Sequence, residues 1–349
     1  MCSPLEEVKT IPKTRGGGTF SDPGTINLHG NDFSWEEKME ELSSDERKLV
    51  DEYLCRCQEE VRQLDLENLE FPITVCETEG NSWDSHYKVN KRHFPLKNYI
   101  VLAFPLLKSI CSSQSQNECK YIVECGCGTG STLLPLMRQF KDNIHFVGFD
   151  VSHSAVSTLL EHPIAREFTG QGSLTAFPYD ISGVGTLSSD EPEKVRARKE
   201  YRDLKGTLVE KVPGCNVGVN GVILVFVLSS LPSFKSMLYA LKELGSVLKN
   251  DGLLFFRDYA VPDHNLFRFV KQSNPTTNSL SFCKGDGTLQ MFFEINFTRE
   301  LFRLAGFEEV DGQGLQYHCN RIVNRKNGKK MDKVFINGTF KLSTSCSSD

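Results

Sequence analysis

The sequence lacks any apolar run of about 18 residues, and we therefore predict no membrane-spanning helix. It has no apolar signal-peptide core near its start, and its acidic character beyond residue 30 is atypical of a mitochondrial presequence. An excess of basic residues is missing as well, since 40 Lys and Arg stand against 45 Asp and Glu, a net charge of −5. This balance excludes a generally basic coat for nucleic acid, so any RNA contact must come from a local patch.

The twelve cysteines lack the spacing of a zinc site. Cys55/Cys57 and Cys125/Cys127 are close pairs, but no second pair at a matching distance and no cluster of histidines accompanies them. Cysteines scattered through a chain of 349 residues are typical of reduced thiols. We therefore expect core or surface thiols, no metal, and a cytoplasmic location, with the nucleus as the alternative.

What the sequence does contain is a short apolar strand that stops at a glycine-rich turn. Residues 121–125 form the strand, and Gly126, Gly128 and Gly130 follow at alternate positions. Because glycine has no Cβ, the backbone there can turn tightly and approach a ligand closely. The apolar residues within 133–140 then predict a helix, whose unpaired N–H groups face the turn. This order of strand, turn and helix predicts a site for a bound ligand.

Acidic residues follow the next two predicted strands. The apolar run 144–149 ends in Asp150, and a shorter run, 176–179, ends in Asp180 and Ile181. The carboxyl ends of parallel strands meet at one edge of a sheet. At this edge Asp150 can accept hydrogen bonds from both hydroxyls of a ribose, and Asp180 can meet an adenine amino group. We therefore predict a cofactor that contains a nucleoside; a dinucleotide site and a glycine loop without a ligand are the alternatives.

The rest of the chain predicts extensions around one α/β domain. Residues 1–30 are rich in Gly, Pro, Thr and Ser and are predicted to be disordered. Residues 31–110 form a helical extension, and residues 111–342 form the main domain, with a charged insertion at 182–220 and a tail at 343–349. The later predicted elements are strands at 222–228, 253–256 and 289–296, a turn at 250–252, a helix capped by Thr298 and a hairpin within 315–341.

Several motifs together resemble a known family. Glu124 stands two residues before the first glycine, and Glu-x-Gly-x-Gly-x-Gly resembles the first motif of class I methyltransferases that use S-adenosylmethionine. Further segments resemble one subgroup, the METTL/Trm140-like enzymes that make 3-methylcytidine in tRNA. These segments are W-D-S-H-Y-K-V-N at 83–90, F-V-L-S-S-L-P at 226–232, F-R-D-Y at 256–259, G-D-G-T at 285–288 and the closing basic hairpin at 320–340.

This resemblance implies a class I, Rossmann-like α/β methyltransferase fold. The fold would have a mostly parallel seven-stranded sheet with helices on both faces, plus an N-terminal helical extension that carries a cofactor lid and an RNA-binding region. The resemblance also implies S-adenosylmethionine as the cofactor and tRNA as a partner. An aminoacyl-tRNA synthetase, such as seryl-tRNA synthetase, or another accessory protein is the further partner it implies.

The resemblance places two groups of residues at the site. The residues expected around the cofactor are Trp83, Tyr87, Glu124, Gly126, Gly128, Gly130, Asp150, Asp180, Ile181 and Val225. The residues expected to bind RNA are Lys88, Arg257, Lys284, Arg321, Arg325, Lys326, Lys329 and Lys330. An aromatic face such as that of Trp83 suits a sulfonium cation or an adenine ring. The basic turn within 315–341 suits phosphates, although a solubilising hairpin is the alternative for it.

The expected reaction is methyl transfer to N3 of cytidine 32 in the anticodon loop of tRNAs for serine, threonine or arginine. The N3 lone pair needs no strong base, so the enzyme must chiefly align it with the methyl–sulfur bond. Positive charge reaches the base as the methyl group moves, and a nearby carboxylate favours that state. Asp258 and Asp286 are the candidates for this catalytic role. A salt bridge to Arg257 or a helix cap is the alternative for Asp258.

Some positions depart from the family pattern and leave other functions open. Residues 94–99 stand where F-F-K-D-R is usual and lack the Asp-Arg pair; His86 replaces an aromatic residue, and Cys283-Lys284 replaces Val-Arg. These changes affect the expected RNA contacts and so the choice of tRNA. The alternatives are a class I methyltransferase of a protein side chain or small molecule, or a non-catalytic methyltransferase-like scaffold subunit.

Overall fold

The computed structural model describes residues 32–64, 79–90, 96–113, 118–183, 203–272, 280–323, 328 and 330–343. The disorder predicted for residues 1–30, the tail after 343 and residues 184–202 of the predicted insertion lie outside this part. Within it, no helix is long and apolar enough to cross a membrane. The same residues contain no group of three or more His, Cys, Asp or Glu side chains placed to hold a metal ion.

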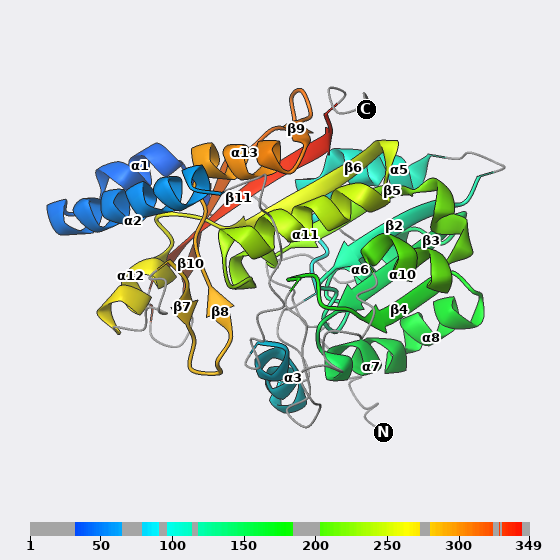
Figure 1. Cartoon of the computed structure of the whole chain (residues 1–349). Helices are drawn as coiled ribbons and strands as arrows, with labels where there is room; N and C mark the ends of the chain where they lie inside the picture. Colours follow the sequence, from blue (N-terminus) through cyan, green and yellow to red (C-terminus); the bar gives the residue numbers. More distant parts are fainter. Residues whose placement is uncertain are drawn as a thin grey trace, which may run out of the picture.

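A nine-stranded mixed sheet forms the centre of the molecule (Figure 1). Its strands lie in the order β1-β10-β11-β6-β5-β2-β3-β4, and β9 pairs with β11. The strands from β6 to β4 are parallel, whereas β11 runs antiparallel to β6, β9 and β10. The bounds are β1 Asp32–Phe33, β2 Lys120–Cys125, β3 Ile144–Asp150, β4 Leu174–Pro178, β5 Val219–Val225, β6 Leu248–Tyr259, β9 Phe307–Glu309, β10 Gln316–Val323 and β11 Lys330–Leu342.

Helices cover both faces of this sheet, and a small hairpin stands beside it (Figure 1). The hairpin pairs β7 (Phe282–Cys283) with β8 (Leu289–Gln290). The helices are α1 Trp35–Glu40, α2 Ser44–Arg62, α3 Glu79–Val89, α4 Ile100–Ala103, α5 Pro105–Ser112, α6 Leu133–Gln139, α7 His153–Glu161, α8 Pro163–Gly170, α10 Leu204–Lys211, α11 Phe234–Val247, α12 His264–Lys271 and α13 Ile295–Leu304, with short 3₁₀ turns at Pro213–Val217 and Leu228–Ser230.

Side chains of the central strands alternate between two cores. Along β5, Val222 and Leu224 belong to one core, and Ile223 and Val225 belong to the other. Since successive residues of a strand point to opposite faces, an unbroken apolar run is what a sheet covered on both faces requires. Helices α2, α10, α11, α12 and α13 complete the first core, and α4 to α8 complete the second.

The mostly parallel sheet with helices on both faces confirms the predicted fold class, but the sheet is wider than seven strands. Two short strands account for the difference. Strand β1 pairs with β10 and strand β9 pairs with β11, both in antiparallel orientation. The hairpin predicted within 315–341 is present as β10 and β11. Helix α8 was not predicted from the sequence.

Three local predictions were wrong. The strand predicted at 289–296 ends after Gln290, because helix α13 begins at Ile295. Glu294, and not Thr298, caps that helix, since its carboxylate accepts the N–H groups of Asn296 and Phe297. The residues predicted as a turn at 250–252 lie within β6, where the pairing register with β5 shifts.

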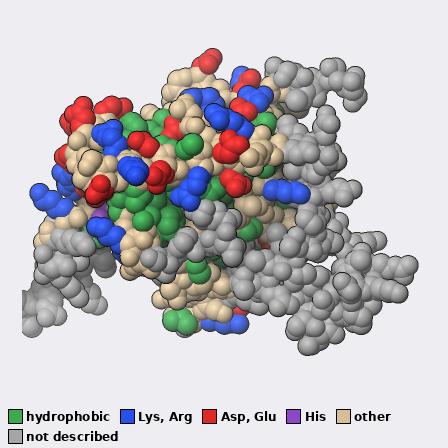
Figure 2. All heavy atoms as spheres, turned by 60° about the vertical axis from the view of Figure 1, so that its left-hand side comes forward, with side chains coloured by type: hydrophobic (Ala, Val, Ile, Leu, Met, Phe, Trp, Pro, Cys, Tyr) green, Lys and Arg blue, Asp and Glu red, His purple; other side chains and the backbone are tan. Residues whose placement is uncertain are grey.

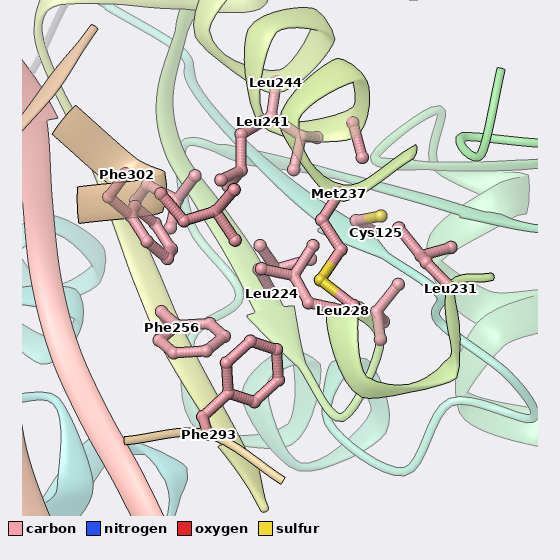
Figure 3. Packing of buried hydrophobic residues seen from close by; sticks show 14 of the residues in the cluster. Cys125, Leu224, Leu228, Leu231, Met237, Leu241, Leu244, Phe256, Phe293 and Phe302 are labelled. Carbon is pink, nitrogen blue, oxygen red and sulfur yellow. The ribbon is translucent and has the colours of Figure 1, made fainter. Parts of the chain in front are cut away.

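Phenylalanine rings pack together with leucines and Met237 in the core between α11, α13 and the sheet (Figure 3). The rings of Phe302 and Phe340 stack 3.9 Å apart. Phe256 contacts Phe302 at 5.0 Å and Phe293 at 5.7 Å, measured between ring centroids. All four of these side chains are at most 1 % exposed, so this cluster ties α13 to β6 and β11.

We predict that Phe302→Ala lowers the free energy of unfolding by about 3–5 kcal/mol, because it leaves a cavity beside Phe340 and Phe256. Val217→Ala is the control, since Val217 is 65 % exposed and surface changes usually stay within about 0.5 kcal/mol. Denaturant unfolding of the two variants and the wild type measures the difference. A loss below 1 kcal/mol in Phe302→Ala would contradict this packing.

Candidate functional site

A pocket opens at the carboxyl ends of β2, β3, β4 and β5. About 880 Å³ of space, open solvent included, lies within it. The turn after β2, the end of β3 and the segments 179–182 and 225–231 line it, together with two aromatic residues of α3. In open α/β sheets this is the edge where ligands bind, at the point where the strand order reverses.

The glycine turn adopts the conformation that the sequence predicted. Gly126, Gly128 and Gly130 have φ values of 65°, 51° and 85°, in the left-handed region that glycine enters without steric cost. A Cβ on Gly126 would collide with Val227, and one on Gly128 would collide with the Tyr87 hydroxyl. Gly126 and Gly128 line the pocket. Gly130 does not; a Cβ there would meet Leu134 and Leu159, so it allows close helix packing.

Asp150 lies at the end of β3 and lines the pocket. Its Oδ2 accepts the N–H of Gly128 at 2.8 Å, and its Oδ1 accepts the N–H of Ser152 at 2.9 Å. Burial raises the pKa of this carboxyl to about 6, although both backbone N–H groups oppose the shift. The group is therefore mostly ionised at pH 7, and each oxygen keeps a lone pair for a further hydrogen bond.

Asp180 and Ile181 lie on the same pocket edge, after β4. One carboxylate oxygen of Asp180 accepts both the N–H and the hydroxyl of Ser182. Burial raises the pKa of Asp180. Ile181, which the resemblance places beside the cofactor, is 6 % exposed, belongs to the first core and supplies an apolar surface at the pocket. Val225, at the end of β5, lines the pocket as well.

Helix α3 carries Trp83 and Tyr87 to the pocket. Their rings lie 6.0 Å apart at an interplanar angle of 30°, so they present neighbouring aromatic surfaces. The Lys284 ammonium lies 5.1 Å from the centroid of the Trp83 ring. Both aromatic residues therefore occupy the positions that the resemblance implied for a lid.

Asp84 anchors this helix to the first turn of α7. Its Oδ1 accepts the Ser152 hydroxyl at 2.8 Å and the Ser154 N–H at 2.9 Å. Its Oδ2 pairs with Lys88 at 2.8 Å. Although burial opposes the shift, the hydrogen bonds from Lys88, Ser154 and Ser152 hold the pKa of Asp84 well below its usual value. Asp84 therefore stays ionised and holds α3 beside Asp150.

Lys97 is a pocket residue that sequence analysis did not assign. It is 4 % exposed, and its Nζ donates to the hydroxyls of Ser131 and Thr132. Burial lowers the pKa of Lys97 and raises that of Glu124, and each charge favours the charged form of the other. The Glu124 Oε2 atom is buried and has no hydrogen-bond partner among the described residues. Glu124 itself does not line the pocket.

These residues fit the cofactor that the sequence predicted. Lys97 lines the pocket and can pair with the carboxylate of an amino-acid moiety. Asp150 can accept from ribose hydroxyls, and the rings of α3 suit a sulfonium group or an adenine. A Cβ on Gly126 or Gly128 would collide with side chains of the pocket. Only glycine therefore fits at these two positions of the turn.

The two acids predicted to be catalytic do not line the pocket. Asp258 is 0 % exposed, and its two oxygens accept the N–H groups of Ser229 and Tyr259. Asp286 accepts the Thr288 N–H and contacts the His86 Nδ1 at 2.8 Å, which joins the hairpin turn to α3. Their catalytic role stays a prediction, and the geometry favours a positioning role for Asp258 through the loop that carries Ser230.

The predicted RNA-binding residues lie at separate places. Lys88 is exposed and paired with Asp84, Lys284 lies over Trp83, and Arg257 is only 2 % exposed. Arg321 pairs with Asp332 and Glu41, and Lys330 is exposed. Arg325, Lys326 and Lys329 lie outside the described residues. Their role in RNA binding stays a prediction.

Charges of both signs alternate over the described part of the face that carries α1 and α2 (Figure 2). This face therefore presents no continuous basic patch in the part that the structure describes. The pattern agrees with the net charge of −5. It limits the role of phosphate attraction on this face.

Sequence analysis missed Tyr179, Phe226, Val227 and Leu231 as pocket residues. Each follows directly, or within a few residues, a strand that points at the pocket. Their position after a predicted parallel strand was the available signal, because strand ends converge on the ligand side. For Phe226 the predicted strand ran three residues too far, whereas β5 ends at Val225.

Comparisons with known proteins agree with this geometry. A family model described as "Methyltransferase domain" matches residues 103–311. The chain is 29 % identical over 260 residues to the human protein named tRNA N(3)-cytidine methyltransferase METTL6, covering 74 % of this chain and 78 % of that protein. It is 26 % identical over 266 residues to the Saccharomyces cerevisiae tRNA(Thr) (cytosine(32)-N(3))-methyltransferase, covering 76 % and 37 %. It is also 27 % identical over 222 residues to O-methyltransferase 3 of Dictyostelium discoideum, covering 63 % and 43 %.

We predict that Asp258 makes the protein less stable as the pH rises. Burial raises the pKa of this carboxyl from its ordinary value near 4 to about 7 in the folded protein. The folded state therefore binds more protons than the unfolded state between these values, and stability falls as the pH rises through this window.

Asp258→Asn removes this titration. The free energy of unfolding of the wild type minus that of the variant should therefore fall steadily from pH 4 to pH 7. The variant also loses one acceptor, which shifts this difference by an amount that does not depend on pH. Denaturant unfolding at intervals of half a pH unit measures the difference. A difference that stays constant across the window would contradict the protonation of Asp258 in the fold.

Proposed function

We propose that the chain transfers a methyl group to N3 of cytidine 32 in tRNA. It belongs to the methyltransferase-domain family, whose model matches residues 103–311. The methyl donor is S-adenosylmethionine, which supplies an electrophilic methyl group on a sulfonium sulfur. The observation that carries the proposal is the pocket at the strand ends, with Asp150, Lys97 and the α3 rings at its wall. The relatives named as tRNA N3-cytidine methyltransferases support the choice of substrate.

The residues of the pocket have to bind and orient, because the reaction needs no strong base. The N3 atom of a neutral cytosine already carries its lone pair, so alignment is the main contribution that the protein makes. Lys97, Asp150 and Asp180 fix the donor at three separate points. Tyr87 and Trp83 cover it and exclude water from the side of α3. Asp258 fixes the loop 226–231 through the Ser229 N–H.

The tRNA partner follows from the same proposal, and an accessory protein such as an aminoacyl-tRNA synthetase is the further partner we propose. The basic residues of the closing hairpin are the proposed phosphate contacts. The proposed location is the cytoplasm, with the nucleus as the alternative, because the cysteines of the described part are free thiols and reduced thiols are typical of these compartments. The second candidate function is methyl transfer to an oxygen atom, which the name of the similar O-methyltransferase 3 favours.

We predict that Asp150→Ala weakens binding of S-adenosylhomocysteine about 100-fold or more. The change removes two charge-assisted hydrogen bonds to the ribose, each worth about 1.5–3 kcal/mol. Calorimetry on the purified chain measures the dissociation constant, and a thermal melt confirms that the variant is folded. Asp311→Ala, at an exposed position, is the control. Wild-type affinity in Asp150→Ala would remove this carboxylate from the site.

We predict that the purified chain converts cytidine 32 of a serine, threonine or arginine tRNA to 3-methylcytidine. N3 lies on the Watson–Crick edge, so only an unpaired or extruded cytidine can present it, as in an anticodon loop. Nucleoside mass spectrometry after incubation with total tRNA and the donor, with and without a synthetase, detects the product. A transcript with uridine at position 32 is the control substrate. Normal 3-methylcytidine in tRNA from cells that lack this protein and any paralogue would reject the assignment and favour the second candidate.

A further inference from the structure

Phe226 connects the donor pocket with a neighbouring group of aromatic rings. It follows β5 directly, lines the pocket and has a φ of 63°. A bulky residue in this left-handed region is strained, and such strain is typically found at functional sites. The Phe226 N–H donates to the Arg257 carbonyl at 2.9 Å. The fold therefore holds this ring in its place at the pocket wall against a local cost.

The Phe226 ring stacks on Tyr259 at 4.7 Å and 28°, and Phe335 packs against both at 5.6 and 6.0 Å. These three side chains are partly exposed. On the same strand as Tyr259, Phe255 and Phe256 are 0 % exposed. The strand thus changes from core rings to partly exposed rings where it reaches the pocket edge. We call Phe226, Tyr259 and Phe335 the aromatic cluster.

A buried cation lies behind the aromatic cluster. The Arg257 guanidinium is 4.3 Å from the centroid of Phe335 and 5.5 Å from that of Tyr99. Its terminal nitrogens contact Asn337 and His318. No carboxylate of the described residues lies within ion-pair distance, and the Arg257 Nε has no hydrogen-bond partner among them. A cation without a paired carboxylate disfavours a cationic acceptor, such as a lysine or arginine side chain of a protein.

We propose that the aromatic cluster is the acceptor subsite, on which the planar base that receives the methyl group stacks. This inference rests on the proposed function and names the part of the chain that holds the base. Stacking on an aromatic ring is worth about 1–3 kcal/mol per base, enough to offset much of the cost of unstacking it from a loop. Phe226 belongs to both the pocket and the cluster, so a base stacked there has its edge next to the donor. The chemistry required of the acceptor is that of a neutral pyrimidine.

The test compares Phe226→Gly, Phe226→Tyr and Tyr259→Leu in the full chain. Glycine removes the ring and adopts the left-handed backbone without strain, so the variant is expected to fold. Phe140→Leu is the matched control, because Phe140 is a partly buried phenylalanine at the end of α6 that does not line the pocket. The readouts are the kcat and KM of methyl transfer to tRNA at saturating donor, and the dissociation constant of S-adenosylhomocysteine.

Loss of one stacking contact should lower kcat/KM for tRNA about 5- to 150-fold in Phe226→Gly and Tyr259→Leu. Phe226→Tyr should keep most of the activity, and Phe140→Leu should match the wild type. Tyr259→Leu should bind S-adenosylhomocysteine as the wild type does. Pyrrolocytosine at position 32 of the tRNA is a fluorescent probe of stacking. Its fluorescence should be quenched when the wild type binds and should not be quenched when Phe226→Gly binds.

The outcomes separate this proposal from the proposed function. Wild-type kcat/KM in both ring-deleted variants, with normal 3-methylcytidine formation, would overturn the acceptor subsite and leave the function intact. If Phe226→Gly and Tyr259→Leu lost donor affinity and activity to the same extent, the cluster would only shape the donor pocket. That result would also overturn the acceptor subsite. Absence of 3-methylcytidine with the wild type itself would reject the proposed function, and the subsite for a cytosine with it.

Discussion

Carboxylates buried at the strand ends, and held there by backbone N–H groups, are the constraint on which the site depends. Asp150, Asp180 and Asp258 stand at or just after the ends of β3, β4 and β6, and each accepts N–H groups of nearby loops. A buried carboxylate without donors costs several kcal/mol, so each acid requires its loop to fold back on it. The loops fixed in this way carry the pocket residues of the glycine turn, 179–182 and 225–231.

The lid depends on the same edge. Asp84 ties α3 to the start of α7 beside Asp150, and His86 contacts Asp286 in the turn between β7 and β8. Helix α3 therefore bridges two parts of the chain that are separated by well over a hundred residues. It also lies outside the matched family domain, which begins at residue 103. The matched domain supplies most of the residues that line the pocket, and the preceding segment supplies Lys97 and the aromatic residues Trp83 and Tyr87.

The sequence was sufficient for features that depend on local patterns. The glycines, Asp150, Asp180 and the unbroken apolar strands follow from residue type and spacing, because a tight turn and a doubly covered sheet each restrict the residues allowed. It was insufficient where long-range contacts decide. Lys97 becomes a pocket residue only when residues 96–99 pack on the glycine turn, with its N–H bonded to the Ser131 carbonyl. The burial of Asp258 also depends on long-range contacts, since its carboxylate accepts the Ser229 N–H of the loop after β5. Phe226 lies inside the strand predicted at 222–228, whereas the observed strand β5 ends one residue before it.

The acidic balance of the chain and the partly exposed rings beside the pocket bear on the same question of how an RNA base is held. A protein with a net charge of −5 gains little from phosphate attraction over its whole surface, and such attraction weakens further with salt. Stacking on rings depends far less on salt than phosphate contacts do. In this molecule the rings lie next to the donor pocket, whereas several of the described basic side chains are already paired with carboxylates, as Lys88 is with Asp84 and Arg321 with Asp332. This composition therefore favours two separate contacts. The aromatic rings hold the base by its face, and a few local cations position the tRNA.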